Sequence, residues 1–231
     1  MIYFTGDIHG VPWKIVRFVE RMSLTNKDTI VILGDVGANY FLDERDAAMK
    51  SVLDKLGIDI LCIHGNHEIR PANIKSYKLQ EWKNGKVWCE ESYPNLKFAK
   101  DGEVYHLDSK RYIAIGGAYS VDKYYRQVRG YGWWSDEQPD DEIKKYVEQQ
   151  LAKGAYDNIL SHTCPYKYEP RDMFLSGVDQ STVDSSTEEW LDKIESQYEY
   201  DNWLCGHWHT DRQVDKLHFL YDTWKSSDNL L

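Results

Sequence analysis

Apolar residues along this chain gather in short runs, several of which end in a glycine followed by a polar residue. Runs at 2–5, 29–33 and 58–63 have the length and composition of buried strands. The stretches 11–22 and 43–56 between them place apolar residues on one face of a helix. Alternation of strands and helices in this order predicts a mainly parallel sheet.

The pattern changes after residue 70, where short strand-like runs are separated by turn residues. These runs predict a second, more antiparallel sheet packed on the first, with strands at 86–89, 96–99, 103–107 and 111–115. Helices are expected at 140–153 and at 187–198, the second with Thr187 as a candidate N-cap. The alternating segment 213–224 predicts a closing hairpin strand.

Two segments interrupt this order without apolar periodicity. Residues 121–138 are rich in aromatic and charged side chains, and residues 165–187 are long and polar. Long irregular segments in a compact domain often border functional sites. We therefore expect a single domain over 1–231 with an α/β fold, a two-sheet β-sandwich flanked by helices, in which both segments are insertions beside the site.

Composition narrows the possible functions. With 231 residues, 42% of them hydrophobic, the chain can build one sizeable core. The formal net charge of −10 argues against non-specific binding along nucleic acid, which requires a basic surface. A small anionic substrate stays compatible with this charge, because bound cations would dominate the local field.

The cysteines and the hydropathy of the chain bear on its location. The four cysteines are scattered without a Cys-x-x-Cys pair, and three of them lie in or beside apolar runs, as reduced core residues do. A cytoplasmic protein is therefore expected. The sequence contains no apolar run of 18 residues, and a motif already begins at Asp7, so neither a membrane span nor a signal peptide is expected.

Polar residues of the kinds that bind metal ions follow five of the apolar runs. The five motifs are Asp7-Ile8-His9, Gly34-Asp35, Gly65-Asn66-His67-Glu68, Ser161-His162 and Gly206-His207-Trp208-His209. Loops after the carboxyl ends of strands share one edge of an open α/β sheet, so these side chains can converge. Oxygen and imidazole ligands without thiolate indicate a catalytic metal site more than a closed structural zinc site.

The spacing of these residues is compatible with two metal ions. Asp7 and His9 are two positions apart, as are His207 and His209, so each pair can point to one side of an extended segment. The carboxylate of Asp35, shared between the two metal ions, would complete the set of ligands. A two-metal site holds its ions about 3.5–4 Å apart, generates hydroxide near neutral pH and stabilises the attacking and leaving oxygens of phosphoryl transfer.

Together the five motifs resemble those of the calcineurin-like metallophosphoesterase family, whose pattern is Asp-x-His, Gly-Asp, Gly-Asn-His-Glu/Asp, a lone His and Gly-His-x-His. The resemblance implies the fold of that family and two divalent or trivalent metal ions, with manganese first and iron, zinc, cobalt and nickel as alternatives. The first ion would be held by Asp7, His9, Asp35 and His209. The second would be held by Asp35, Asn66, His162 and His207.

The same resemblance implies roles for the neighbours of Asn66. His67 would be the catalytic acid, protonating the leaving oxygen or stabilising its developing charge. Glu68 would orient His67 or a ligand imidazole. The implied reaction is hydrolysis of a small phosphomonoester or phosphodiester by a hydroxide that bridges the two ions. The net charge of −10 argues against nucleic acid as a partner, and the lack of an 18-residue apolar run argues against a membrane.

Other functions remain as alternatives. Serine/threonine protein phosphatases continue the second motif as Gly-Asp-x-x-Asp-Arg-Gly and carry His-Gly-Gly as the fourth. This chain reads Gly34-Asp35-Val36-Gly37-Ala38-Asn39 and Ser161-His162-Thr163 at these places, so a protein phosphatase is the second choice. A nuclease is disfavoured by the net charge of −10. A binding module without catalysis would be expected to lack a ligand, and none is missing.

Several candidate residues also have simpler explanations. The polar residues after each strand could cap turns, although five motifs in this order disfavour that explanation. His64, His106 and His218 compete with His162 for the lone-histidine position, but His162 alone ends an apolar run between the third and fifth motifs.

Arginine and aromatic residues near the motifs suggest substrate contacts. Arg70 and Arg126 are candidates to bind the substrate phosphate through paired hydrogen bonds, with solvated surface arginines as the simpler alternative. The pairs Tyr124-Tyr125 and Trp133-Trp134 could stack on a nucleobase, but such residues more often serve packing.

Overall fold

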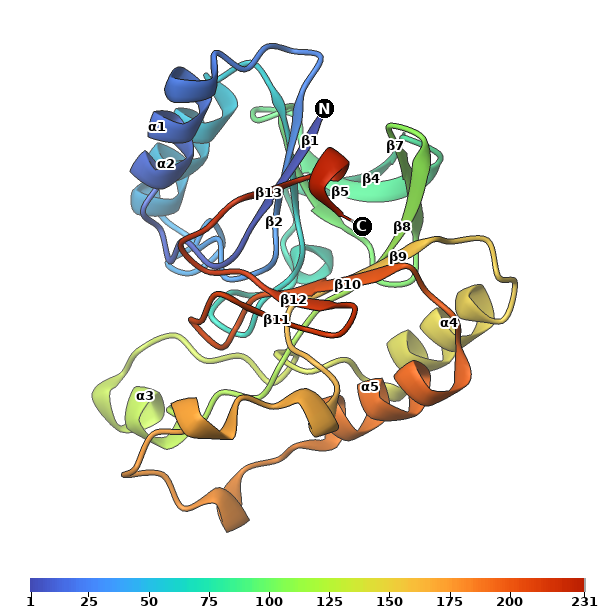
Figure 1. The fold of residues 1–231 in the computed structure, drawn as a ribbon. Coiled ribbons are helices and arrows are strands. Elements are labelled where there is room, and N and C mark those ends of the chain that lie inside the picture. Colours follow the sequence, from blue (N-terminus) through green and yellow to red (C-terminus); the bar gives the residue numbers. More distant parts are fainter. Residues whose placement is uncertain (231) are drawn as a thin grey trace.

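The computed structural model describes residues 1–230, in which two β-sheets pack face to face and helices cover their outer faces (Figure 1). This is the two-sheet β-sandwich flanked by helices that the sequence predicts. Its extent as a single domain over 1–231 stays a prediction, and position 231 lies outside the described residues.

The first sheet has seven strands, of which the central four are parallel. In spatial order they are β13 (Lys225–Ser226), β1 (Ile2–Thr5), β2 (Thr29–Ile32), β3 (Asp59–Cys62), β6 (Leu96–Ala99), β5 (Gly85–Glu90) and β4 (Tyr77–Trp82). Helices α1 (Trp13–Met22) and α2 (Glu44–Asp54) pack on its outer face, as the apolar spacing predicted.

The second sheet has six strands, and its central four are also parallel. In spatial order they are β11 (Arg212–Val214), β12 (Leu217–Phe219), β10 (Asn202–Cys205), β9 (Asn158–Ser161), β8 (Lys110–Ile115) and β7 (Val104–Leu107). Helices α4 (Asp141–Leu151) and α5 (Ser186–Gln197) cover its outer face. Ser185, rather than Thr187, occupies the N-cap position of α5.

The predicted composition of the second sheet was wrong in two respects. The runs at 86–89 and 96–99 extend the first sheet, because β6 pairs in parallel with β3 and places Leu96 opposite Ile60. Only the two edge strands of the second sheet are antiparallel to their neighbours. Apolar alternation identifies a strand, but it does not reveal which strand is its partner.

Short helices occupy the two segments that the sequence left without periodicity. Residues 121–138 contain helix α3 (Lys123–Arg129), which was not predicted. Residues 165–187 contain the 3-10 turns η2 (Tyr166–Tyr168), η3 (Arg171–Met173) and η4 (Gln180–Thr182). Two further 3-10 turns lie elsewhere in the chain, η1 (Pro71–Asn73) and η5 (Ser227–Asn229).

Apolar side chains fill the space between the two sheets. Phe4 of the first sheet and Tyr112 of the second lie with ring centroids 5.5 Å apart, and both are almost fully buried. The four cysteines are buried free thiols, as expected for core residues. None of the helices within residues 1–230 has the length and apolarity to cross a lipid bilayer.

We expect Phe4→Ala to lower the free energy of unfolding by about 3–5 kcal/mol, because it opens a cavity between the sheets. Phe41→Ala, at a phenylalanine that is 45% exposed, is the matched control and should cost less than about 1 kcal/mol. Urea unfolding followed by circular dichroism would measure both. Equal costs would contradict the inferred packing of the two sheets.

Candidate active site

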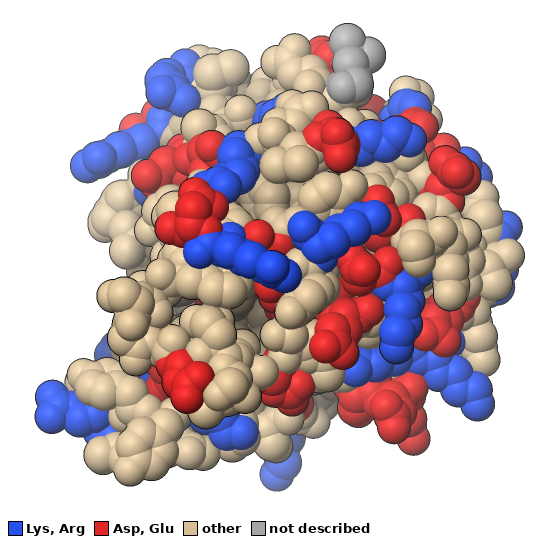
Figure 2. Space-filling model, turned by 60° about the horizontal axis from the view of Figure 1, so that its bottom comes forward, with Lys and Arg blue, Asp and Glu red and all other residues tan. Residues whose placement is uncertain are grey.

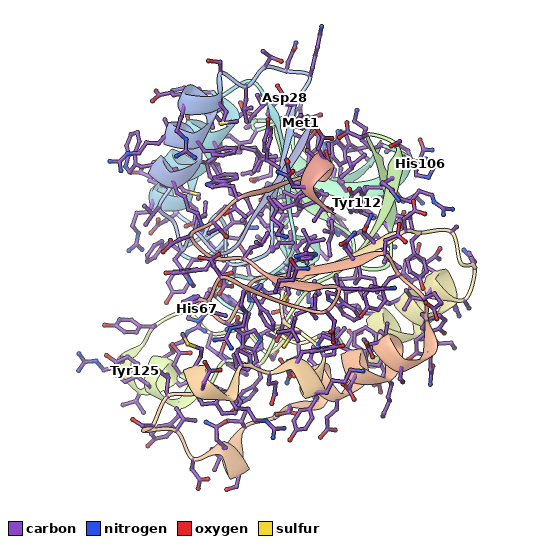
Figure 3. The ribbon with its side chains drawn as sticks, viewed as in Figure 1. Met1, Asp28, His67, His106, Tyr112 and Tyr125 are labelled. Carbon is purple, nitrogen blue, oxygen red and sulfur yellow. The ribbon has the colours of Figure 1, made fainter. Side chains whose placement is uncertain are left out.

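Loops after five strands bring the predicted metal ligands to one place. Asp7 follows β1, Asp35 follows β2 and Asn66 follows β3, all in the first sheet. His162 follows β9, and the last motif follows β10, in the second sheet. The motifs therefore converge as predicted, but between the carboxyl edges of two sheets rather than along one. Figure 3 shows His67 in this region, on the side where α3 and Tyr125 lie.

The first group of donor atoms surrounds the carboxylate of Asp7. Its Oδ2 atom lies 3.3 Å from Nε2 of His209 and 3.7 Å from Nε2 of His9. These two ring nitrogens are 2.8 Å apart. Burial would raise the pKa of Asp7, but the nearby His209 ring and the charges of His162 and His9 hold it below its ordinary value.

The second group surrounds the side-chain oxygen of Asn66. This oxygen lies 2.8 Å from Nε2 of His162 and 3.1 Å from Nδ1 of His207. At its other ring nitrogen, Nδ1, His162 lies 2.8 Å from the carbonyl oxygen of Leu33. Because a carbonyl only accepts hydrogen bonds, the proton belongs on Nδ1. In the neutral ring, Nε2 then directs a lone pair at the Asn66 oxygen.

Asp35 lies between the two groups. One carboxylate oxygen, Oδ1, is 3.7 Å from Nε2 of His162, and the other, Oδ2, is 4.0 Å from Nδ1 of His9. Asp35 is 2% exposed, so its charge is largely removed from water. This position allows the carboxylate to contact both groups, as the predicted bridging role requires.

The chemistry of these donor atoms suits metal ions. Oδ2 of Asp7 is buried without a hydrogen-bond donor among the described residues, an expensive state for a carboxylate. In each of three groups of residues, one donor atom per residue lies within 4.8 Å of the others. The groups are Asp7, His9 and His209; His9, Asp35 and His67; and Asp7, Asp35 and His162. Oxygen and imidazole donors of this kind suit manganese, iron, zinc, cobalt or nickel.

Four of the proposed ligands have an unusual backbone conformation. The φ angles are +43° at His9, +46° at Asp35, +66° at His207 and +47° at His209. Non-glycine residues rarely adopt this left-handed region, and such strain costs about 1–3 kcal/mol at each position. Strained residues gathered in one place support a functional site.

Three glycines of the motifs each leave room for a ligand from another motif. A Cβ atom on Gly34 would lie 2.0 Å from Nδ1 of His162, and one on Gly206 would lie 2.3 Å from Oδ1 of Asp7. A Cβ atom on Gly65 would lie 2.0 Å from Oδ1 of Asp35. The glycines before the ligands therefore allow this close approach between motifs.

His67 and Glu68 occupy different environments. The His67 side chain is 31% exposed, and its Nε2 lies 3.9 Å from Oδ1 of Asp122. Glu68 is fully buried and accepts a hydrogen bond from the backbone N–H of Gly65. Burial, reinforced by Asp35, raises the pKa of Glu68 to about 8. No imidazole within residues 1–230 donates to Glu68, so its contacts favour support of the loop backbone over the predicted orientation of a ring.

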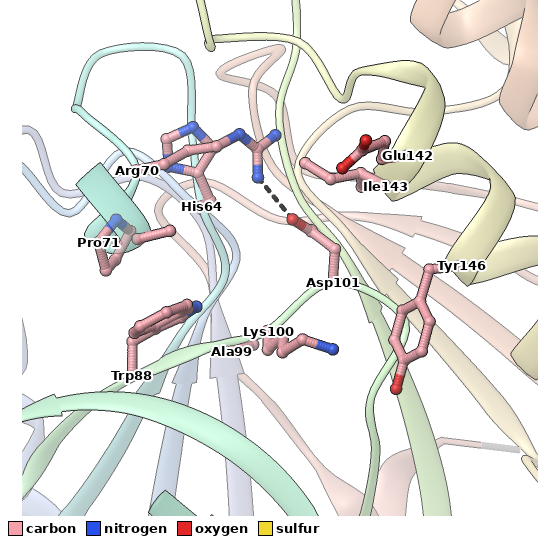
Figure 4. Close-up of a pocket in the computed structure, with 11 residues that line it drawn as sticks. His64, Arg70, Pro71, Trp88, Ala99, Lys100, Asp101, Glu142, Ile143 and Tyr146 are labelled. Atoms are coloured by element: carbon pink, nitrogen blue, oxygen red, sulfur yellow. Dashed lines mark hydrogen bonds and ion pairs between the residues drawn. The ribbon is translucent and has the colours of Figure 1, made fainter. Parts of the chain in front are cut away.

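The two candidate arginines do not line the cavity that contains His67. Arg70 is 7% exposed, and its Nη1 donates to Oδ2 of Asp101 at 2.5 Å. It lines a separate cavity of about 240 Å³ with His64 and Tyr146 (Figure 4). Contact of Arg70 with substrate phosphate is therefore not supported by its position.

Arg126 lies behind the site and contacts it through Ser120. Its Nη1 donates to Oγ of Ser120 at 3.0 Å, and its Nε donates to the carbonyl of Gly132 at 2.7 Å. The side-chain amide of Asn66 donates to the same Oγ at 2.9 Å. This arrangement turns the Asn66 oxygen toward the histidines. Ser120 was not predicted as a site residue, although it ends a glycine-rich turn after β8, as the ligand motifs end their strands.

The competing histidines lie elsewhere. His64 is buried on the Arg70 side, and His218 is buried with Nε2 3.1 Å from Oδ1 of Asn202. His106 is on the exposed face of β7. His162 alone of these rings reaches Asn66 and Asp35, which supports its choice from the sequence.

We expect Gly65→Ala to weaken metal binding by about 10–100-fold, because its Cβ atom would displace the Asp35 carboxylate. Gly177→Ala is the control, since nothing lies within 4 Å of the Cβ atom it would add. Metal titration by calorimetry measures the effect, and circular dichroism checks the fold. Wild-type metal affinity in Gly65→Ala would contradict the role given to this glycine.

Comparisons with known proteins agree with this geometry. A family model described as calcineurin-like phosphoesterase matches residues 1–211. A symmetrical bis(5'-nucleosyl)-tetraphosphatase of Buchnera aphidicola subsp. Baizongia pistaciae is 23% identical over 163 residues, covering 68% of this chain and 54% of that protein. The chain thus spans about half the length of this curated relative.

Two crystal structures share the fold. The protein TT1561 of Thermus thermophilus superposes with a TM-score of 0.54 at 13% identity, covering 95% of this chain and 87% of that one. A phosphopantetheinyl hydrolase of Mycobacterium tuberculosis gives a TM-score of 0.51 at 14% identity, with coverage of 95% and 87%. The family match confirms the family expected from the motifs. With a match that extends from β1 to the last motif, the chain belongs to the calcineurin-like phosphoesterase family.

Proposed function

We propose that the protein hydrolyses a small phosphomonoester or phosphodiester with two bound metal ions. The observation that carries this proposal is the pair of donor groups joined by Asp35 at the wall of a cavity of about 500 Å³. This volume is typical of a small-molecule site. The tetraphosphatase relative is named for hydrolysis of a nucleotide, which supports a small phosphate compound as the substrate here.

The ligands proposed for each ion follow the two groups of donors. The first ion is assigned to Asp7, His9, Asp35 and His209. The second is assigned to Asp35, Asn66, His162 and His207. When bound, the ions supply Lewis acidity toward water and the phosphoryl oxygens. Manganese is the first choice of metal, with iron, zinc, cobalt and nickel as alternatives.

His67 is proposed as the acid that protonates the leaving oxygen. Among the described residues, it is the only histidine lining the cavity that has no place in the two proposed ligand sets, and it is accessible to a substrate there. Burial lowers the pKa of His67 from its ordinary value, and the charges of Asp35 and of Asp122, 3.9 Å from its Nε2, oppose that shift. A proton for a departing alkoxide would therefore come from His67.

The charge distribution disfavours a nucleic acid as substrate. Figure 2 shows basic and acidic side chains interspersed over one face, without a continuous basic surface there. A protein phosphatase remains the second candidate, but the chain lacks the Asp-Arg continuation after Gly34-Asp35. A small phosphoester therefore stays the first choice.

Asp35→Asn tests the shared carboxylate. We expect it to bind less metal and to lose nearly all hydrolysis, because a neutral amide is a poor bridge between two cations. Asp201→Asn, at an exposed aspartate, is the control. Elemental analysis of wild-type protein with and without added Mn²⁺ completes the test. Fewer than about one ion per chain would contradict the two-metal proposal.

His67→Ala and His209→Ala separate the acid from a ligand. His67→Ala should keep its metals and retain more activity on p-nitrophenyl esters than on alkyl esters, because nitrophenolate leaves without a proton. The expected gap is about 10²–10⁴-fold. His209→Ala should lose metal and fail on both ester types. A metal-poor His67→Ala variant, or an equal loss on both esters, would contradict the assignment.

A further inference from the structure

The residues that line the cavity beside the proposed ligands fall into two chemically different sets. One set carries the donor atoms of the metal groups and His67. The other set, called the apolar side below, comes from the segments that precede α3 and connect η2 to α5, together with the last motif. Its main residues are Val121, Met173, Phe174, Val178, Val183 and Trp208.

The apolar side begins directly at the metal ligands. Trp208 lies between His207 and His209 in the sequence, and its ring centroid is 5.1 Å from that of His207. Phe174 stacks on Trp208 with ring centroids 5.6 Å apart and planes at 16°. A phosphate at the metal groups would therefore place its ester substituent against aromatic and aliphatic side chains.

The charges around the cavity leave no cation for a second anionic group. Within residues 1–230, the lining contains neither lysine nor arginine, but it contains the carboxyl groups of Asp122 and Glu188. Burial raises the pKa of Glu188 to about 7. Oligophosphates and substrates with an extra carboxylate are normally held by arginine and lysine side chains. Here only the metal ions and a protonated His67 would offer positive charge.

On the basis of the function proposed above, we propose that this cavity binds the alcohol portion of the substrate, and that this portion is an uncharged apolar group on a single phosphate. An aryl-substituted or branched aliphatic alcohol matches the wall formed by Phe174, Val183 and Trp208. Water released from these side chains would favour such a substrate over a short alkyl phosphate. A dinucleoside oligophosphate is excluded as the preferred substrate.

The test compares esters of two primary alcohols of similar acidity, ethanol and 2-phenylethanol, each as the phosphomonoester and as the methyl diester. With Mn²⁺ supplied, kcat/KM for the 2-phenylethyl compound should exceed that for the ethyl compound by about 10-fold or more. A symmetrical dinucleoside tetraphosphate is the third substrate and should be slower than the 2-phenylethyl ester. Equal kcat/KM values for the two alcohols, or preference for the tetraphosphate, would overturn the proposal.

A binding measurement separates this proposal from the proposed function. Calorimetry with 2-phenylethylphosphonate and ethylphosphonate, which are not phosphoesters, reports on the cavity even if no ester is hydrolysed. The first should bind about 10-fold or more tightly than the second. If all esters are hydrolysed but the two phosphonates bind with equal affinity, the proposed function is retained and the apolar site is overturned. Lack of any hydrolysis would overturn the function, while the phosphonates would still decide the site.

A pair of valine variants locates the effect. Val183→Asp places a charge in the apolar wall and should lower the ratio of kcat/KM between 2-phenylethyl and ethyl esters by about 10-fold. Val214→Asp, at an exposed valine of β11, should leave that ratio unchanged. An unchanged ratio in Val183→Asp would remove this wall from the proposed site. Circular dichroism of both variants checks that they fold.

Discussion

The buried carboxylates of Asp7 and Asp35 need hydrogen-bond donors, and the surrounding loops must be placed so that they provide them. Each has one oxygen that accepts a backbone N–H, from His207 at 2.9 Å and from His67 at 2.8 Å. Charge removed from water is costly unless it is paired. The backbone of the last motif must therefore lie directly against Asp7, and that of the third against Asp35. Side chains at the preceding glycines would prevent this contact.

The site depends on both sheets, so packing in the core determines geometry at the ligands. Asp7, His9, Asp35 and Asn66 are held by the first sheet, while His162, His207 and His209 are held by the second. The backbone N–H of Gly206 donates to the carbonyl of His162 at 2.9 Å, which ties the two loops of the second sheet together. A small rotation between the sheets would separate the donor groups. The apolar layer containing Phe4 therefore helps to keep the donor groups of the two sheets in position.

The sequence was most informative where chemistry and local pattern coincide. The order of five motifs identified residues that the fold brings together, and apolar spacing located α1, α2, α4 and α5 to within a few positions. Contacts between residues far apart in the sequence were harder to predict. The partner of Arg70 is Asp101, 31 positions away, and no local pattern reveals that contact. Ser120 was missed for the same reason, since its role depends on Asn66 and Arg126 meeting at one oxygen.

The left-handed backbone at four proposed ligands places function and stability in opposition. Glycine would adopt these φ angles with less strain, but it would provide no donor atom. The residues that make the site useful are thus ones that a purely stability-driven selection would replace. Bound metal would offset this strain, because it stabilises only the folded chain. Thermal tolerance in this family member would therefore be coupled to metal supply, and a cell short of metal would hold a less stable form of the protein.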